Sequence, residues 1–464
     1  MVDKFIGRMY RLLSTLFQFT ILVIEGIAKK NIHHLHQSIT ELRDTINAKG
    51  ESNSETDKLE AHYKKLMASS FIEYEQGEFE KATRKWIDAA CIKNKELGKI
   101  GLTNPNVKLL GSAFNQIGHL AGGLGSRAML KKLQLTTENY MFLCDGQTNS
   151  FYANLFNSYF PVVNLKPQEL LKINKILWPI VEDVFTVQTN KGTLDFLTAH
   201  NYALQQFNSV GELTPLLSFP EKQAELGWQF LEKYGIKRNS WFITLHVREN
   251  KFDANSKFYA RNANPTTYIP MIDLVKSLGG FVIRIGNKDM TPLPKINGLV
   301  DFSSVKNLPE HMDVFALSQC RFMVGTNSGP SAVPSTFGVP VLITNAVALG
   351  KVAFFPKSMS IPKILMDSSG TEVSFSKLLD SPLGGLDSYL QNWTGFETGM
   401  TWRDNTADEI LNATNEMLNN EAKDLSFEQK ALINRIVPNY TNGTIPVSQY
   451  FISKHRKLFQ EIFE

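Results

Sequence analysis

The stretch that decides the fold runs Val324-Gly-Thr-Asn-Ser-Gly-Pro-Ser331 and continues as Phe337-Gly-Val-Pro-Val-Leu-Ile-Thr344. Its pattern predicts a strand that ends near Val324, a small polar turn, a helix over 331–337 and a second strand over 341–344. Pro330 suits the first turn of a helix, where its missing N–H costs nothing. A helix that begins here would present free backbone N–H groups to the turn, so the stretch predicts a diphosphate-binding loop.

The alternative interpretation of this loop is an ordinary βαβ turn that needs glycine only for its backbone conformation. On the phosphate interpretation, Asn327, Ser328 and Ser331 add side-chain donors. At Gly329, a branched side chain would meet the phosphate or conflict with the φ angle of the turn. The candidate donor-binding residues of the loop are Gly325, Thr326, Asn327, Ser328, Gly329 and Ser331.

A second motif follows the stretch Trp241-Phe-Ile-Thr-Leu-His-Val247, whose alternating, β-branched pattern predicts a strand. His246 and Arg248 therefore stand at the carboxyl end of a strand, where the side chains of a parallel sheet line the ligand crevice. The planar fork of arginine matches a phosphate group, so we predict that both residues bind the donor. The structural alternative is a local ion pair between Arg248 and Glu249.

The motifs together resemble those of a known family. HVREN at 246–250, YARNANPTTYIPMIDLVKSLGGFVIRIGNKDMTPLP at 259–294, MDVF at 312–315 and GTNSGPSAVPSTFGVPVLITN at 325–345 resemble bacterial glycosyltransferases of surface-polysaccharide gene clusters. The likeness is dense from Trp241 to Asp367. More distantly, HVRE is similar to the His-x-Arg motif of fucosyltransferases, whose arginine contacts the donor diphosphate. GTNSGPS with GVP is similar to the donor-side loop of heptosyltransferases.

This resemblance implies an α/β fold with two facing Rossmann-like domains, of the GT-B type, and a nucleotide-sugar held mainly by the second domain. The implied reaction moves a sugar from a nucleotide-sugar donor, for which a GDP-linked sugar is one candidate, to a surface glycan or glycolipid. The catalytic candidates are Arg248, which would stabilise the leaving diphosphate, Glu249 as base or sugar contact, and His119. The resemblance makes His119 a base or acceptor contact, and its alternative role is a bond to neighbouring backbone.

Three further residues are substrate candidates. Arg284, at the end of a predicted strand over 281–285, is expected either to contact phosphate or base, or to form a surface ion pair with Asp289. Arg261 and Asn262 lie in the loop after the strand at 241–247 and are expected to recognise donor or acceptor. No Asp-x-Asp pair follows a predicted strand, so we expect no obligatory metal and no other cofactor.

Element patterns predict five regions. An apolar helix lies in 1–30, and a helical region over 31–104 contains one tetratricopeptide-like helix pair. A Rossmann-like N-terminal domain covers 105–235, a second Rossmann-like domain covers 236–370, and C-terminal helices cover 371–464. The resemblance implies that the first of these two domains binds the acceptor and the second the donor. Strands over 107–110, 140–144 and 160–164 belong to the first domain. In the second, the alternation of helix 268–278, strand 281–285 and strand 322–324 predicts a parallel sheet covered by helices.

The amino terminus carries an uncharged, mostly apolar run from Leu12 to Ile24. Thirteen helical residues cover about 20 Å, less than the roughly 30 Å of a bilayer core, so the run predicts an interfacial or partner-buried helix rather than a span. A cleaved signal peptide is the alternative. The formal charge of +4 is too small to indicate nucleic-acid binding. The three cysteines are scattered along the chain, which argues against a disulfide framework. We expect a cytoplasmic protein, with peripheral contact to the inner membrane face through this helix.

Two other functional classes remain open. A sugar-nucleotide epimerase shares the two-domain fold, and a non-catalytic glycan-binding or scaffold subunit would use the helical region to dock. Loss of Arg248 would leave a docking protein functional, whereas it would impair either enzyme. A transferase releases free nucleotide only when an acceptor is supplied, which an epimerase does not require.

Overall fold

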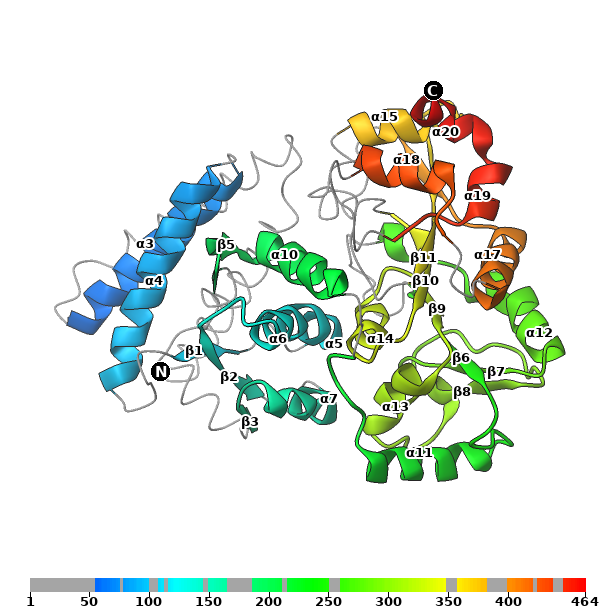
Figure 1. Ribbon diagram of the computed structural model, residues 1–464, viewed down its shortest axis with the longest axis horizontal. Coiled ribbons are helices and arrows are strands. Elements are labelled where there is room, and N and C mark those ends of the chain that lie inside the picture. The colour runs from blue at the N-terminus through cyan, green and yellow to red at the C-terminus, as the bar shows by residue number, and fades with distance from the viewer. Residues whose placement is uncertain are drawn as a thin grey trace, which may run out of the picture. The chain divides into compact units, whose positions relative to one another are not determined.

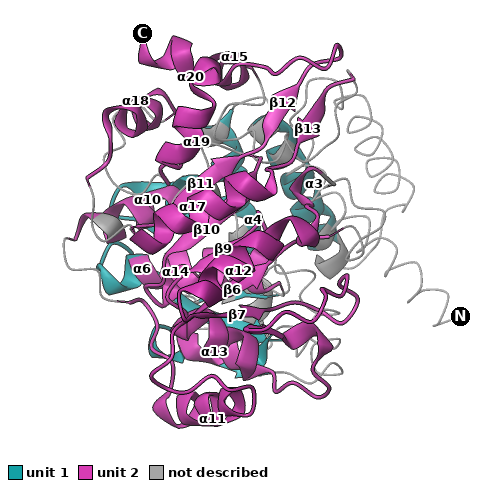
Figure 2. Ribbon diagram, turned by 90° about the vertical axis from the view of Figure 1, so that its right-hand side faces the viewer, with its two compact units in different colours: residues 1–115, 130–150, 157–200 teal, residues 116–129, 151–156, 201–464 magenta. Residues whose placement is uncertain are grey.

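The computed structural model describes residues 55–75, 78–99, 107–111, 116–144, 149–164, 186–210, 215–249, 259–347, 357–381, 399–419, 424–436 and 445–464. The predicted apolar helix at 12–24 and most of the loop after Glu249 lie outside these residues. Contacts divide the chain into two compact units, coloured separately in Figure 2. Unit 1 holds residues 1–115, 130–150 and 157–200, and unit 2 holds residues 116–129, 151–156 and 201–464.

Unit 1 combines a helical pair with a small parallel sheet. Helices α3 (Glu55–Glu75) and α4 (Phe79–Lys99) pack along each other and bury side chains such as Trp86, in the region where a helix pair was predicted. Strands β1 (Val107–Leu110), β2 (Asn139–Cys144) and β3 (Val162–Asn164) form a parallel sheet in the order β1-β2-β3, which confirms the three predicted strands. A hairpin of β4 (Thr186–Thr189) and β5 (Gly192–Asp195) completes the described strands of the unit.

Unit 2 is built on a six-stranded parallel sheet. Its strands are β6 (Phe242–His246), β7 (Phe281–Arg284), β8 (Leu299–Asp301), β9 (Met323–Gly325), β10 (Val341–Ala346) and β11 (Met359–Pro362). They lie in the order β11-β10-β9-β6-β7-β8, and every pair is parallel. Counted from β6, this is the strand order of a doubly wound Rossmann sheet. Both faces are covered, which explains why strands such as β6 and β10 are buried along their whole length.

Helices cover both faces of this sheet. Figure 1 shows α12 (Ile269–Ser277) and α17 (Ala407–Asn419) on one side, and α13 (His311–Gln319) and α14 (Val333–Thr336) on the other. The predicted helix over 268–278 is confirmed as α12. Helix α12 ends at Ser277, and Gly279 just beyond it has a φ of +80°, the left-handed conformation that follows many helix ends. Helix α11 (Glu221–Glu232) packs beside α13.

The C-terminal region differs from the prediction of helices alone. Strands β12 (Ile364–Met366) and β13 (Thr401–Arg403) pair antiparallel, so the boundary predicted at residue 370 falls within one packed unit. The remaining helices are α15 (Phe375–Asp380), α18 (Phe427–Ile436), α19 (Gln449–Lys454) and α20 (Arg456–Phe463). Helix α17 begins with a capping box, in which Thr406 and Glu409 each accept the backbone N–H of the other.

The boundary predicted at residue 235 also differs from the contacts. Residues 116–129 and 151–156 belong to unit 2 together with α11, although the sequence suggested that they lie in the first Rossmann-like domain. The first of these segments comprises α5 (Ile117–His119), a π-helical turn over Leu120–Leu124 and the start of α6 (Gly125–Lys132). The other described helices are α7 (Ser150–Asn154) and α10 (Phe196–Ser209). No described helix is both long enough and apolar enough to cross a membrane.

Candidate functional site

The candidate site lies where β6 and β9 end, because the order of the strands reverses between them. From β6 the chain adds β7 and β8 on one side, then returns to add β9, β10 and β11 on the other. In open α/β sheets, ligands bind in the crevice beyond the carboxyl ends of the strands that flank such a reversal. The two predicted motifs, at 246–249 and 325–331, follow these two strands.

Hydrogen bonds join the two motifs. The Thr326 N–H donates to the His246 carbonyl oxygen at 3.1 Å, and the Arg248 N–H donates to Thr326 Oγ1 at 3.0 Å. Ser331 Oγ donates to the Thr326 carbonyl oxygen at 2.7 Å, and both side chains are buried. Buried groups that already bond within the loop hold its shape, so we reassign Thr326 and Ser331 from donor contacts to loop-shaping residues. Gly325 lies within β9, paired with His246.

The helix after this loop is shorter than predicted. A 3-10 turn over Gly329–Ala332 leads into the single turn of α14, in place of a continuous helix over 331–337. The Ser331 N–H donates to the Ser328 carbonyl oxygen at 3.1 Å, which removes it from the expected set of phosphate donors. A phosphate here would therefore depend on the N–H groups of Asn327, Ser328 and Gly329 more than on a helix dipole, since few peptide units are aligned behind them.

His246 orients the Ser328 hydroxyl. The ring Nδ1 lies 3.2 Å from the Ile285 carbonyl oxygen, and Nε2 lies 3.0 Å from Ser328 Oγ. A carbonyl oxygen can only accept, so Nδ1 carries the proton of the neutral ring and Nε2 accepts the Ser328 hydroxyl hydrogen. The Ser328 hydroxyl hydrogen therefore already has a partner in this structure, and its predicted contact with a phosphate stays a prediction.

Burial lowers the pKa of His246 to about 4, with Arg284 and Arg248 adding to the shift. In the unfolded chain His246 binds a proton near pH 6.5, whereas in the folded chain it stays neutral until about pH 4. The folded state is therefore expected to lose stability as the pH falls from 6.5 towards 4. Between pH 7 and pH 5 this residue should cost about 2 kcal/mol of unfolding free energy. Urea denaturation of wild type and His246→Gln at both pH values measures it. An equal pH dependence in the two proteins would contradict the assignment.

Segment 116–129 packs directly against the loop after β9. A Cβ atom built on Gly118 would lie 2.4 Å from Gly329 Cα, and one on Gly329 would lie 3.1 Å from Gly118 N. Gly329 is not among the glycines with positive φ. It is therefore glycine because two backbones approach closely, and the predicted requirement for an unusual φ is wrong. His119, which is exposed, belongs to the short helix α5 that contacts the turn at Gly329. Its role in acceptor activation stays a prediction.

Arg284 does not occupy the place predicted for it. Its side chain is 0% exposed and ion-pairs with Glu249 Oε1 and Asp301 Oδ2, each at 2.9 Å, while Asp289 is exposed. Both the surface pair with Asp289 and a direct ligand contact are thus ruled out for this conformation. The second Glu249 oxygen accepts the Thr291 N–H at 3.0 Å. With both oxygens occupied by strong donors, Glu249 is better suited to shape the crevice than to remove a proton.

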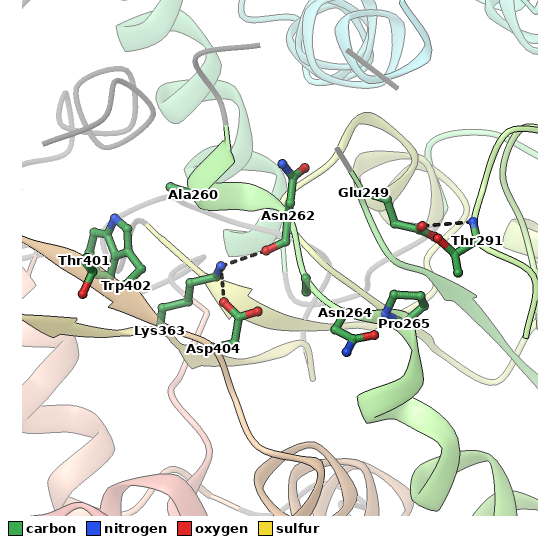
Figure 3. A pocket seen from close by; sticks show the side chains of 11 residues that line it. Glu249, Ala260, Asn262, Asn264, Pro265, Thr291, Lys363, Thr401, Trp402 and Asp404 are labelled. Atoms are coloured by element: carbon green, nitrogen blue, oxygen red, sulfur yellow. Dashed lines mark hydrogen bonds and ion pairs between the residues drawn. The ribbon is translucent and has the colours of Figure 1, made fainter. Parts of the chain in front are cut away.

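Arg248 links the crevice to a neighbouring pocket. Its Nη1 donates to Asn262 Oδ1 at 2.7 Å, so the predicted surface pair with Glu249 is replaced by a bond to the loop that precedes α12. Asn262 lines a pocket of about 510 Å³, shown in Figure 3. Arg261 lies in the short 3-10 turn before Asn262 and is not one of the lining residues. The structure therefore brings Arg248 and Asn262 together.

Sequence reasoning missed the far wall of this pocket. Lys363, which is 3% exposed, donates from Nζ to the Asn262 carbonyl oxygen at 2.8 Å and to Asp404 Oδ1 at 2.6 Å. Burial lowers the pKa of the Lys363 ammonium, and Asp404 opposes that shift. Trp402, on β13, lies beside this pair (Figure 3). The one available signal was a lone lysine within the apolar run 359–366.

Comparison with known proteins finds distant similarity to solved structures. No family model matches the chain, and no curated protein does. A family 9 glycosyltransferase from Veillonella parvula is 10% identical, with a TM-score of 0.35, over 55% of this chain and 84% of that one. The E. coli ADP-heptose heptosyltransferase II is 9% identical, with a TM-score of 0.30, over 51% of this chain and 84% of that one. The iron-containing glycosyltransferase TibC of enterotoxigenic E. coli H10407 is 14% identical, with a TM-score of 0.32, over 67% of this chain and 76% of that one. All three are glycosyltransferases.

Proposed function

We propose that the protein is a glycosyltransferase of the GT-B type that moves a sugar from a nucleotide-sugar donor to a glycan or lipid-linked acceptor. One observation carries this proposal. At the strand reversal of a Rossmann-ordered sheet, Arg248 and the loop after β9 are hydrogen-bonded together, and Arg248 also holds a wall of an adjacent pocket. This arrangement offers a place for a diphosphate beside a cavity large enough for the group attached to it.

The chemistry needs three functions, namely a stabilised leaving diphosphate, a tolerated oxocarbenium-like centre and a deprotonated acceptor hydroxyl. Arg248 and the N–H groups of residues 327–329 would stabilise the diphosphate. His119 is the candidate base, since it lies next to the glycine contact that packs on this loop. A metal-independent reaction, a GDP-linked donor and membrane contact through residues 12–24 are parts of the same proposal.

The proposal is tested by binding and by turnover. Isothermal titration with nucleoside diphosphates and their sugar conjugates asks whether a donor binds, and a stabilising ligand also raises the melting temperature in proportion to its affinity. Release of nucleoside diphosphate from a bound donor, only when an acceptor glycan is added, separates a transferase from an epimerase. A protein that binds neither the nucleotides nor their conjugates would overturn the proposal.

Arg248→Lys is expected to weaken donor binding by roughly tenfold or more, although the positive charge is retained. The flexible ammonium cannot reproduce the planar fork, and it also loses the bond that positions Asn262. Ser328→Ala is the matched comparison. Its hydroxyl already donates to His246, so its loss should change donor affinity by only a few-fold. Isothermal titration calorimetry measures the donor affinity of both variants. An unchanged affinity for Arg248→Lys would mean that the diphosphate binds elsewhere.

A further inference from the structure

The pocket beside Arg248 has a composition that indicates its ligand. We propose that it binds a neutral, hydroxyl-rich sugar ring, with Trp402 against the carbon–hydrogen face and the Lys363–Asp404 pair on the hydroxyl groups. The inference rests on the proposed function, which requires a sugar but does not locate it. All the lining residues belong to unit 2, as does the candidate phosphate loop.

The polarity of the walls favours a sugar over a nucleobase. Of the 11 lining residues, four are apolar, and Trp402 is the one aromatic side chain among them. A base has two flat apolar faces and is usually held between apolar or aromatic groups. A pyranose instead carries hydroxyl groups around its whole edge, and these require polar partners on several sides. The pocket supplies such partners from Asn262, Asn264, Thr291, Thr401, Lys363 and Asp404.

The charges of the pocket are matched, which disfavours a phosphate. Lys363 Nζ lies 2.6 Å from Asp404 Oδ1, and Glu249 Oε1 lies 2.9 Å from Arg284 Nη2. A phosphate in the pocket would face two carboxylates with their cations already paired. Contacts between a phosphate and a carboxylate are repulsive. A neutral ligand meets no such repulsion.

The Lys363–Asp404 pair is suited to hydroxyl groups. An ammonium has three N–H donors, and the bonds of Lys363 to the Asn262 carbonyl oxygen and to Asp404 use two of them. The third N–H and the second oxygen of Asp404 place a donor next to an acceptor. A sugar hydroxyl both accepts and donates, so it can bond to both partners at once. Figure 3 shows the pair beside Trp402 and opposite Glu249 and Thr291.

Calorimetry with matched ligand pairs tests the proposal. The ligands are GDP with GDP-mannose, UDP with UDP-glucose and ADP with ADP-glucose, and the proteins are wild type, Asp404→Asn and Lys363→Met. Asp404 is 43% exposed, so its amide replacement should preserve the fold even if removal of the buried lysine does not. Lys430→Met, at an exposed position outside the pocket, is the matched control.

If the ring belongs to the donor, both pocket variants should bind the sugar conjugate roughly tenfold or more weakly and the free diphosphate as wild type does. If the ring belongs to the acceptor, donor affinities should stay unchanged and KM for the acceptor glycan should rise by a similar factor. Either result supports the proposal. Equal losses for the free diphosphate and its conjugate would indicate a base pocket and overturn it, as would no change for any ligand.

A second measurement keeps this test separate from the proposed function. If wild type binds no nucleotide at all, the proposed function fails, yet the pocket can still be probed with neutral methyl glycosides by saturation-transfer NMR. A transfer signal in wild type that disappears in Asp404→Asn and persists in Lys430→Met would uphold the sugar pocket. Absence of any signal in wild type would reject it.

Discussion

Arg284→Met is expected to lower the free energy of unfolding by about 3–5 kcal/mol, the largest stability loss among the changes considered. The substitution keeps the approximate length of the side chain but leaves Glu249 and Asp301 without their cation, and both carboxylates are largely buried. Arg284 Nη1 also donates to the Thr291 carbonyl oxygen at 2.8 Å, so the loop after β7 loses an anchor. Urea denaturation followed by circular dichroism measures the loss.

Two comparisons isolate the ion-pair contribution. Asp289→Asn removes the exposed carboxylate that the sequence suggested as the partner of Arg284, and it should leave stability within about 0.5 kcal/mol of wild type. Combining Arg284→Met with Glu249→Gln and Asp301→Asn removes every charge of the group, and it should recover much of the loss because no unpaired charge remains buried. If the single and triple variants were equally unstable, lost packing rather than charge would be the cause.

Gly118→Ala is expected to destabilise unit 2 by about 1–3 kcal/mol and to weaken donor binding. The added methyl group would lie 2.4 Å from Gly329 Cα, and the neighbour is backbone, which cannot move aside as a flexible side chain can. Either segment 116–129 or the loop after β9 must shift. Melting temperature and donor affinity, measured on the same variant, report the two consequences.

Gly125→Ala is the matched control for this contact. It lies in the same segment, at the start of α6, but its Cβ would be 3.6 Å from Thr336 Cγ2, an ordinary contact distance. Alanine also favours helix over glycine by about 0.5–1 kcal/mol, so this variant should be neutral or stabilised. A Gly118→Ala protein as stable as Gly125→Ala, with unaltered donor affinity, would show that segment 116–129 does not pack on the loop as described.

Much of the parallel sheet was predictable because its strands are short apolar runs bounded by polar or glycine-rich turns. The predictions for β6, β7, β9 and α12 agree with the structure to within two residues. Strands β11, β12 and β13 were not predicted, and the sequence Thr401-Trp-Arg403 of β13 has no alternating apolar pattern. That omission also hid the Trp402 side of the pocket.

The candidate site was predictable in its location more than in its contacts. Arg248 and the loop after β9 were expected at one crevice, and parallel pairing places them there because carboxyl ends share one sheet edge. The roles of Arg284 and Ser328 were not predictable. Each depends on a partner distant in the chain, Asp301 or His246, whose proximity follows only from the strand order.

The sequence by itself determined the alternation of strand and helix in unit 2 and the two motifs at the ends of β6 and β9, because these depend on residues close together in the chain. Tertiary structure alone decided that Arg284 is buried, that Gly118 and Gly329 meet, and that Lys363 bonds to Asn262 and Asp404 in the wall of a pocket. Such contacts join segments between 17 and 211 residues apart, shown by Arg284 with Asp301 and by Gly118 with Gly329. Their energies depend on burial and partner geometry, which local pattern does not encode.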